Sequence, residues 1–232
     1  MRIGGLQKCS LIDYPGKVSC VIFTQGCNFR CPYCHNRELV LPEHFKETIP
    51  EEDVLTLLTK RREYLEGVVI TGGEPTEQED LLQFMDKIKS MGYFLKLDTN
   101  GSRPHIIRAV IQSGLADYVA MDIKTSLEKY QKAIGVNFPV ELIQESIELI
   151  QGLGIQYEFR TTVVRPFCEF EDIRQISALM KDKERYRLQA FRESPKMINR
   201  NLSEVNQATP EEVQGWERRL GDSYYYNPCF DL

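Results

Sequence analysis

Three cysteines lie in the run GCNFRCPYCHN with the spacing C-x3-C-x2-C: Cys27, Cys31 and Cys34. Three thiolates on one short loop can ligate three irons of an iron–sulfur cluster, which leaves the fourth iron without a protein ligand. An open metal position is where a substrate or cofactor binds and where chemistry takes place. The spacing therefore favours a catalytic cluster over one that only stores electrons.

Two other interpretations of these cysteines are weaker. A zinc site would take His35 as its fourth ligand, but His35 directly follows Cys34, and adjacent side chains rarely point at the same metal. Structural zinc sites usually combine two separated ligand pairs, and the sequence has no second cysteine pair. Disulfides are also disfavoured, because the chain has 7 cysteines and no secretory leader. We therefore expect a reducing, cytoplasmic location.

Size and charge limit the kind of protein further. A chain of 232 residues with 42% hydrophobic residues is long enough to bury one substantial core, so one domain is expected. The formal net charge of −5 argues against a nucleic-acid partner, since such proteins usually carry a basic face. No apolar run approaches the roughly 20 residues that span a bilayer, so no membrane association is expected.

Short apolar runs alternate with amphipathic stretches along the chain. Strands are expected at 18–24, 67–71, 93–98, 117–123, 155–164 and 185–191. Helices are expected at 51–65, 78–91, 104–113, 126–133, 139–152 and 170–182, and a capping box at Thr209 and Glu212 begins a last helix. Six strands alternating with helices predict a parallel α/β sheet, either a partial barrel or a doubly wound sheet. In both, the site lies at the carboxyl ends of the strands.

Polar residues follow the predicted strands, where such a site would lie. They are Gly72, Gly73, Glu74 and Pro75 after the second strand, Asp98, Thr99, Asn100 and Gly101 after the third, Asp122 and Lys124 after the fourth, Arg160 on the fifth and Gln189 on the sixth. Taken singly, the glycines are ordinary turn residues and the charged residues are solvated strand ends. Together, one polar group at the end of each strand predicts a convergent site.

The combination of C-x3-C-x2-C after a first strand and GGEP after a second resembles the radical S-adenosylmethionine superfamily. The longer text GLQKCSLIDYPGKVSCVIFTQGCNFRCPYCHN, with LDTNG and MDIK further on, resembles the enzymes that activate glycyl radical proteins. Within these it most resembles the activating proteins of anaerobic ribonucleoside-triphosphate reductase. The resemblance covers about residues 1–190 and implies a partial (β/α)6 barrel of parallel strands.

The resemblance also implies roles for single residues. The three cysteines would ligate a [4Fe–4S] cluster whose fourth iron chelates the amino and carboxylate groups of S-adenosylmethionine. By the same resemblance, Gly72, Gly73 and Glu74 would hold the methionine amino group, and Lys124 would meet the carboxylate. Asp98, Thr99 and Asp122 would hold a monovalent cation, and Asn100 would support the same region. Arg160 and Gln189 would lie near the ribose and the cleaved bond, and Tyr33 would lie near the adenine. Glu74 and Lys124 suit the two charges by charge-assisted hydrogen bonds.

The implied reaction is reductive cleavage of S-adenosylmethionine to a 5′-deoxyadenosyl radical, which abstracts hydrogen from a glycine of a partner enzyme, anaerobic ribonucleotide reductase above all. A low-potential donor such as flavodoxin or ferredoxin would supply the electron. The short stretch 36–50 leaves no room for further clusters. We expect a catalytic domain at 1–191, with a loop and helix at 192–232 packed on it.

Two alternatives stay open at this stage. One is a radical enzyme that acts on a small molecule in cofactor or modified-nucleoside biosynthesis. The other is a non-catalytic iron–sulfur carrier or a structural zinc protein.

Overall fold

The computed structural model describes residues 1–199, 202 and 207–220 of the chain. Its centre is a seven-stranded sheet in the order β1-β2-β3-β4-β5-β6-β7. The strands are β1 (Ile3–Ser10), β2 (Ser19–Thr24), β3 (Gly67–Gly72), β4 (Phe94–Thr99), β5 (Tyr118–Asp122), β6 (Gln156–Val163) and β7 (Tyr186–Ala190). β2 to β7 are parallel, and β1 pairs antiparallel with β2.

The strand order decides between the two architectures that the sequence allows. A doubly wound sheet reverses its strand order at a switch point, whereas a barrel adds each new strand on the same side. Here β2 to β7 follow one another without a reversal, and β1 and β7 do not pair. The fold is therefore the predicted α/β partial barrel, open between its two edge strands.

The edge strand β1 is the main difference from the sequence prediction, which began the sheet at residue 18. Its sequence IGGLQKCS holds two glycines, and residues 7–9 are exposed. Such a segment lacks the apolar alternation by which a strand is recognised. It forms because the chain folds back against β2, where Ile3 pairs with Thr24 and Ser10 pairs with Ser19.

The helices follow the predicted pattern with shifted ends. They are α1 (Arg37–Val40), α2 (Glu51–Lys60), α3 (Leu81–Ser90), α4 (Pro104–Gln112), α5 (Tyr130–Ile134), α6 (Glu141–Gly152), α7 (Phe170–Ala178) and α8 (Pro210–Leu220). Short 3-10 helices cover Pro42–His44, Pro75–Glu77, Leu127–Lys129 and Lys183–Arg185. α1 was not predicted, and α2 ends five residues before the predicted end at 65. The capping box of α8 is confirmed, because Glu212 accepts from the Thr209 N–H at 2.8 Å and donates its own N–H to the Thr209 hydroxyl at 3.2 Å.

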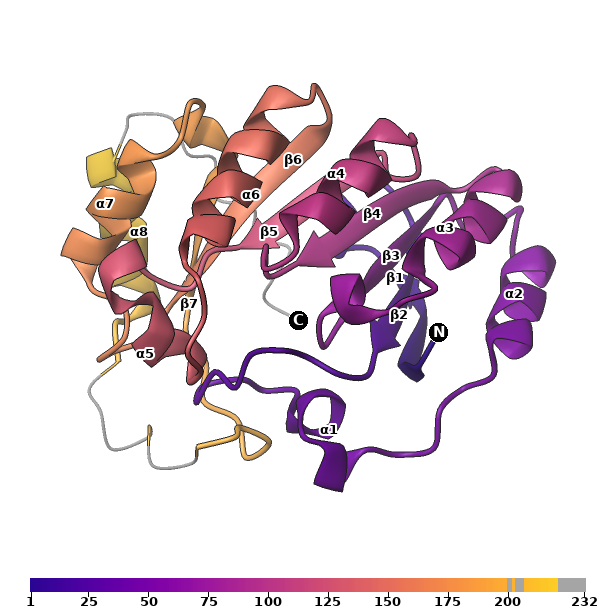
Figure 1. The fold of residues 1–232 in the computed structure, drawn as a ribbon, viewed down its shortest axis with the longest axis horizontal. Coiled ribbons are helices and arrows are strands. Elements are labelled where there is room, and N and C mark those ends of the chain that lie inside the picture. The colour runs from indigo at the N-terminus through magenta and orange to yellow at the C-terminus, as the bar shows by residue number, and fades with distance from the viewer. Residues whose placement is uncertain (200–201, 203–206, 221–232) are drawn as a thin grey trace.

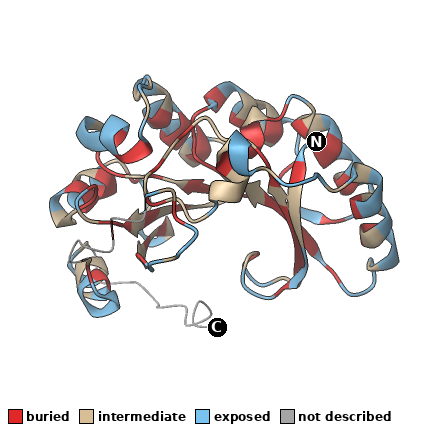
Figure 2. Ribbon diagram, turned by 90° about the horizontal axis from the view of Figure 1, so that it is seen from below, coloured by how far each residue is buried: buried red, intermediate tan, exposed pale blue. Residues whose placement is uncertain are grey.

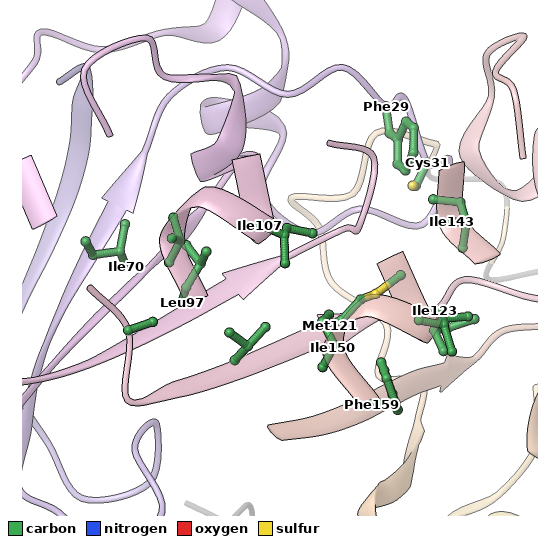
Figure 3. Packing of buried hydrophobic residues seen from close by; sticks show 14 of the residues in the cluster. Phe29, Cys31, Ile70, Leu97, Ile107, Met121, Ile123, Ile143, Ile150 and Phe159 are labelled. Carbon is green, nitrogen blue, oxygen red and sulfur yellow. The ribbon is translucent and has the colours of Figure 1, made fainter. Parts of the chain in front are cut away.

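The hydrophobic core lies between the sheet and the helices on its outer face. Met121 of β5 and Phe159 of β6 point toward Ile150 of α6 there, as Figure 3 shows. Buried residues gather along the strands and on the helix faces turned toward them (Figure 2). In the described part of the chain, no helix has the length and apolar character needed to cross a membrane.

The inner face of the sheet is divided along its length. At its amino-terminal end, Tyr14, Val21 and Val69 form a small buried cluster, and the Tyr14 ring lies 6.1 Å from that of Tyr118. Polar and charged side chains take over toward the carboxyl ends of the strands. The fold thus closes one end of the barrel with apolar groups and keeps the other end for a polar site.

Candidate active site

The cysteine loop is fixed on one side by α5. After β2 the chain runs toward α5 and returns to α1 (Figure 1). The Arg30 N–H donates to the Ile134 carbonyl at 2.8 Å, and the Arg30 guanidinium donates to the Cys27 carbonyl at 2.6 Å. Phe29 is buried, and its ring contacts that of Phe138 edge-on at 5.1 Å. Contacts with α5 and Phe138 and the bond within the loop therefore hold this side of the cysteine loop in place.

On its other side the loop is joined to the residues after β4. The Asn28 amide donates to the Ser102 hydroxyl at 2.8 Å and accepts from the Asn100 amide at 3.0 Å. The same Asn100 amide lies 3.8 Å from the Cys27 sulfur. Two of the predicted site segments thus meet directly at the first cysteine.

The three thiols lie in a largely dry environment. Cys31 is buried, whereas Cys27 and Cys34 are half-buried. Burial raises the pKa of Cys27 to about 12 and that of Cys31 to about 11, so these thiols stay protonated at neutral pH unless a metal replaces the proton. In residues 1–199, 202 and 207–220 no three His, Cys, Asp or Glu side chains are grouped around one ion. An iron–sulfur cluster does not require three side chains around one ion, since each thiolate binds a different iron.

His35 turns toward the chain after β7. Its ring lies 5.6 Å from that of Phe191, and its side chain hydrogen-bonds to the Arg192 backbone. Beyond Arg192, the N–H groups of residues 198 and 199 donate to the carbonyls of Cys34 and Pro32 at 3.1 and 2.8 Å. We call residues 191–199 the strap. The strap lies against the carboxyl half of the cysteine loop.

Glu74 joins the loops that follow β3 and β4. Its side chain is 1% exposed and accepts hydrogen bonds from the Thr76 N–H at 3.0 Å, the Thr76 hydroxyl at 2.5 Å, the Thr99 hydroxyl at 2.8 Å and the Asn100 N–H at 2.6 Å. Three of these bonds reach Oε1 and one reaches Oε2, which keeps one lone pair free. The carboxylate is therefore first of all a link between two loops.

The glycines before Glu74 are required by backbone packing. Gly72 has φ +113°, a conformation that other residues rarely adopt. A Cβ on Gly73 would lie 2.1 Å from the Gly26 carbonyl oxygen. This close approach holds the turn after β3 against the residue that precedes Cys27.

Lys124, Asp122 and Arg160 form an ion-pair chain at the carboxyl ends of β5 and β6. Lys124 lies 3.2 Å from one Asp122 oxygen, and the Arg160 Nε lies 2.8 Å from the other. Burial alone would raise the pKa of Asp122, but Arg160 and Lys124 outweigh it and hold that pKa below its usual range. Burial likewise opposes the charge of Lys124, and Asp122 followed by Cys31 raises its pKa above the usual value. Lys124 is thus a cation beside the cysteine loop.

The chain of charges extends along the inner face to residues that the sequence analysis missed. Arg160 contacts Asp98 at 3.3 Å and Glu158 at 3.7 Å, and buried Lys96 contacts the same two carboxylates at 3.4 and 3.5 Å. Charged residues two apart on otherwise apolar strands share one face. The sequence signal for a polar barrel interior is therefore the presence of two charged residues two positions apart on one strand. Lys96 and Asp98 form one such pair, and Glu158 and Arg160 form the other.

Two predicted residues lie apart from this network. The Tyr33 ring is 8% exposed, packs against Phe167 at 5.7 Å, and holds its hydroxyl buried with no hydrogen-bond partner among the described residues. Gln189 is half-buried on β7 and accepts from the Thr162 hydroxyl at 3.4 Å. It shares the inner face with Arg160 through the pairing of Thr162 with Gln189.

An α/β partial barrel with a three-cysteine loop at the carboxyl end of its first parallel strand defines a class of protein, and comparison with known families gives that class a name. Residues 21–180 match the family model described as the radical SAM superfamily. The chain belongs to the radical SAM superfamily and is an enzyme.

The relatives narrow the type. A Methanocaldococcus jannaschii protein named as a glycyl-radical enzyme activating enzyme is 37% identical over 197 residues, which cover 82% of this chain and 79% of that protein. The pyruvate formate-lyase-activating enzyme of Clostridium pasteurianum is 27% identical over 187 residues, which cover 78% and 76%. This chain is therefore a radical SAM enzyme of the glycyl radical enzyme activating type.

Solved structures confirm the fold. SuiB of Streptococcus suis bound to S-adenosylmethionine superposes with a TM-score of 0.63 at 16% identity, over 79% of this chain and 45% of SuiB. QueE from Escherichia coli superposes with a TM-score of 0.52 at 20% identity, over 81% and 83%. The chain thus spans less than half of SuiB but most of QueE.

The residues of this structure fit the cofactors that the family implies. The donor set of the loop is three thiols, which is the chemistry of an iron–sulfur cluster. One buried oxygen, the Tyr33 hydroxyl, lacks a hydrogen-bond partner within the described residues. Buried polar atoms are normally paired, and an unpaired one calls for a ligand or water. A polar cofactor such as S-adenosylmethionine, bound between the loop and the charged inner face, would supply a partner for it.

Proposed function

We propose that this enzyme activates a glycyl radical protein by hydrogen abstraction, and that the protein is anaerobic ribonucleotide reductase. The observation that carries the proposal is the meeting of the cysteine loop with Asn100 on one side and with the charge of Lys124 on the other. When bound, a [4Fe–4S] cluster and S-adenosylmethionine supply the one-electron cleavage that yields methionine and a 5′-deoxyadenosyl radical, which takes hydrogen from the partner's glycine.

The residues of the chain bind and orient the cofactor in this proposal. Cys27, Cys31 and Cys34 hold three irons. Lys124 pairs with the methionine carboxylate. Its side chain is half-buried, and only one of its three N–H donors is needed for the ion pair with Asp122. Glu74 fixes the conformation of the turn that meets the amino group. Its Oε2 atom has one free lone pair, which can accept a hydrogen bond from that group.

Three residues complete the cofactor site in the same proposal. Tyr33 lines the adenine side, where its buried ring and unpaired hydroxyl support contact with a base. Arg160 and Gln189 face the ribose from the inner sides of β6 and β7.

A monovalent cation beside Asp98, Thr99 and Asp122 belongs to the same proposal. Lys96 lies 3.4 Å from Asp98 Oδ1, and the guanidinium of Arg160 pairs with both carboxylates, so such an ion would compete with two side-chain cations. Thermal stability measured in potassium, sodium and choline salts at equal ionic strength tests the site, because potassium or sodium could occupy it and stabilise the fold, whereas choline is too large to enter.

Three further features belong to the proposal. The electron donor is a low-potential protein such as flavodoxin or ferredoxin, and the enzyme works in the cytoplasm. The catalytic domain is 1–191, and the segment 192–232 packs on it. In support, α8 contacts the barrel through a hydrogen bond of 2.9 Å from the Leu188 N–H to Glu217 and through the Trp216 ring, 5.7 Å from Phe170. Residues 221–232 lie outside the described part.

A second candidate function is radical chemistry on a small molecule. A GTP 3′,8-cyclase relative from Thermococcus kodakarensis is 34% identical over 131 residues, which cover 55% of this chain and 41% of that protein. The shorter coverage makes this the weaker candidate.

Anaerobic reconstitution with iron and sulfide, followed by addition of a one-electron chemical reductant and S-adenosylmethionine, tests the function. We expect 5′-deoxyadenosine to form and a glycyl radical to appear by electron paramagnetic resonance in added anaerobic ribonucleotide reductase. Cleavage without any glycyl radical, in this or other glycyl radical enzymes, would favour the small-molecule candidate. A colourless, iron-free protein would overturn the proposal.

A further inference from the structure

A pocket of about 220 Å³ lies between the edge strand β1 and the segment that follows Cys34. Its walls include Gly4 and Gly5 of β1, His35, and the rim residues Glu38, Lys46 and Lys196. None of these residues has a role in the proposed binding of the cofactors. The pocket therefore calls for an explanation of its own.

The pocket adjoins the cysteine loop. His35 directly follows Cys34, and the Leu39 carbonyl, on the same wall, accepts from the Gly26 N–H at 2.7 Å, one residue before Cys27. The segment that lines the pocket is thus the segment that closes both ends of the loop. A molecule in the pocket would contact the residues that flank the cysteine loop.

Gly5 is the informative residue of the wall. Its φ is not positive, so its backbone does not require glycine, and a Cβ there would meet Phe23 at 3.5 Å, an ordinary contact. Gly4 differs, because a Cβ on it would clash with Gln25 and Leu39 at 2.4 and 2.6 Å. A strand glycine marks a β-bulge or a place where another backbone or a ligand approaches closely. The register of β1 against β2 shifts between Ile3 and Gly5, and the wall of the pocket at Gly5 is left without a side chain.

The edge of β1 supplies main-chain partners at the same place. On the side away from β2, the main-chain pairing of β1 in the described structure is limited to Ile3, whose carbonyl accepts from the Ile49 N–H at 2.8 Å. The Cys9 carbonyl accepts from the Gln7 side-chain amide at 3.1 Å, and the outward main-chain groups of residues 4–8 have no strand paired with them among the described residues, so a further strand could add there.

The volume of the pocket and the charges on its rim limit the class of ligand that it can bind. The volume is below the 300–1,000 Å³ usual for drug-sized ligands, so it suits a few residues of main chain better than a whole nucleoside. The rim carries both signs, since Lys46 pairs with Glu38 at 2.5 Å and Lys196 adds a second cation. Such a rim fits a polypeptide better than a ligand of a single charge.

We propose that this pocket and the open edge of β1 bind an extended, glycine-bearing main-chain segment of the protein that receives the radical. The inference rests on the proposed function and adds the place where the partner's glycine segment is held. A segment without a side chain at its centre can lie flat against Gly5, where a bulkier wall residue would keep it out.

Gly5→Val tests the proposal, because valine is favoured in strands and its methyl groups would fill the pocket. We expect the glycyl radical yield in anaerobic ribonucleotide reductase to fall at least tenfold. Iron content and partner-free formation of 5′-deoxyadenosine should stay unchanged. Gly152→Ala is the control, since a Cβ there meets nothing within 4 Å, and Gly5→Ala should fall between the two.

Hydrogen exchange gives a readout without radical chemistry. Added anaerobic ribonucleotide reductase should slow the exchange of the amides in residues 4–9 of the wild-type protein and not of Gly5→Val. A normal radical yield in Gly5→Val overturns the proposal, and so does loss of its partner-free cleavage, which would assign the pocket to the cofactor. A wild-type protein that makes no glycyl radical shows instead that the proposed function is wrong.

Discussion

The carboxylate of Glu74 accepts the backbone N–H of Asn100 at 2.6 Å, and this contact ties the turn after β3 to the turn after β4. Asn100 in turn contacts Asn28 and the Cys27 sulfur. The two turns and the cysteine loop therefore form one connected unit. A substitution at Glu74 should therefore alter the position of Asn100 beside Cys27.

Glu74→Gln should destabilise the fold by about 2–4 kcal/mol, because hydrogen bonds to a buried charged acceptor contribute roughly 1.5–3 kcal/mol each and the amide N–H₂ would face a donor. Urea unfolding of the metal-free protein measures this. Glu77→Gln is the matched control, since its 2.5 Å pair with Arg103 is partly exposed and should contribute no more than about 1 kcal/mol. Equal effects of the two substitutions would contradict the central place of Glu74.

Lys124→Ala should weaken S-adenosylmethionine binding by roughly 10- to 100-fold, the loss expected for one charge-assisted hydrogen bond. Cluster loading should change little, because Lys124 is not a ligand. Equilibrium binding to the reconstituted protein and iron analysis separate the two effects. Lys132→Ala, an exposed lysine on α5, is the control. Unchanged binding in Lys124→Ala would make this lysine a structural partner of Asp122 only.

The sequence predicts which segments come together where chemistry and spacing coincide. The cysteine spacing, the GGEP turn and the residues after β4 and β5 meet as expected, because parallel strands bring their carboxyl ends to one edge. The strands 67–71 and 93–98 are apolar enough to be recognised within a residue or two of β3 and β4.

What the sequence does not predict depends on contacts between distant segments. β1 is held by pairing with β2 and not by its own pattern, so its glycines and polar residues conceal it. The barrel interior is similar, since Lys96 is an ordinary strand residue until Asp98 and Glu158 are seen beside it. The sequence does not predict that Glu74 links two loops for the same reason, because the four donors to its carboxylate come from the loops after β3 and β4.

The pH dependence of stability should depend in part on Asp172. Burial would raise the pKa of this carboxyl, but hydrogen bonds from Lys129, Ser126 and the Glu169 N–H, at 2.8, 2.7 and 2.9 Å, outweigh it and lower the pKa. A lowered pKa in the folded state stabilises above the unfolded value of about 4, and the contribution is lost as the pH falls below it. Asp172→Asn should therefore cost about 1–3 kcal/mol at pH 7 and progressively less below pH 4. Urea unfolding at pH 7, 4 and 3 checks this, and a difference that does not change with pH would contradict it.

Cys31→Ala should abolish cluster assembly and S-adenosylmethionine cleavage, because two thiolates on the loop cannot retain the cluster. Iron content and visible absorption after anaerobic reconstitution measure the loss. Cys9→Ala should leave both unchanged, since Cys9 is exposed near the far end of β1. A reconstituted Cys31→Ala protein with full iron content would show that this cysteine is not a ligand.

The strap should report the state of the cluster. The amides of Ile198 and Asn199 donate to the carbonyls of Cys34 and Pro32, which lie within the ligand loop itself. Irons that hold the three thiolates restrict this loop, and amides bonded to it then open less often. Removal of the cluster should therefore speed hydrogen exchange at these two amides by about tenfold, or about 1.4 kcal/mol of opening free energy. The Ile49 amide, which donates to Ile3 on β1, serves as the control and should not change. Equal exchange of Ile198 and Asn199 with and without iron would show that the strap is held by its own packing, in which the Met197 side chain is 1% exposed.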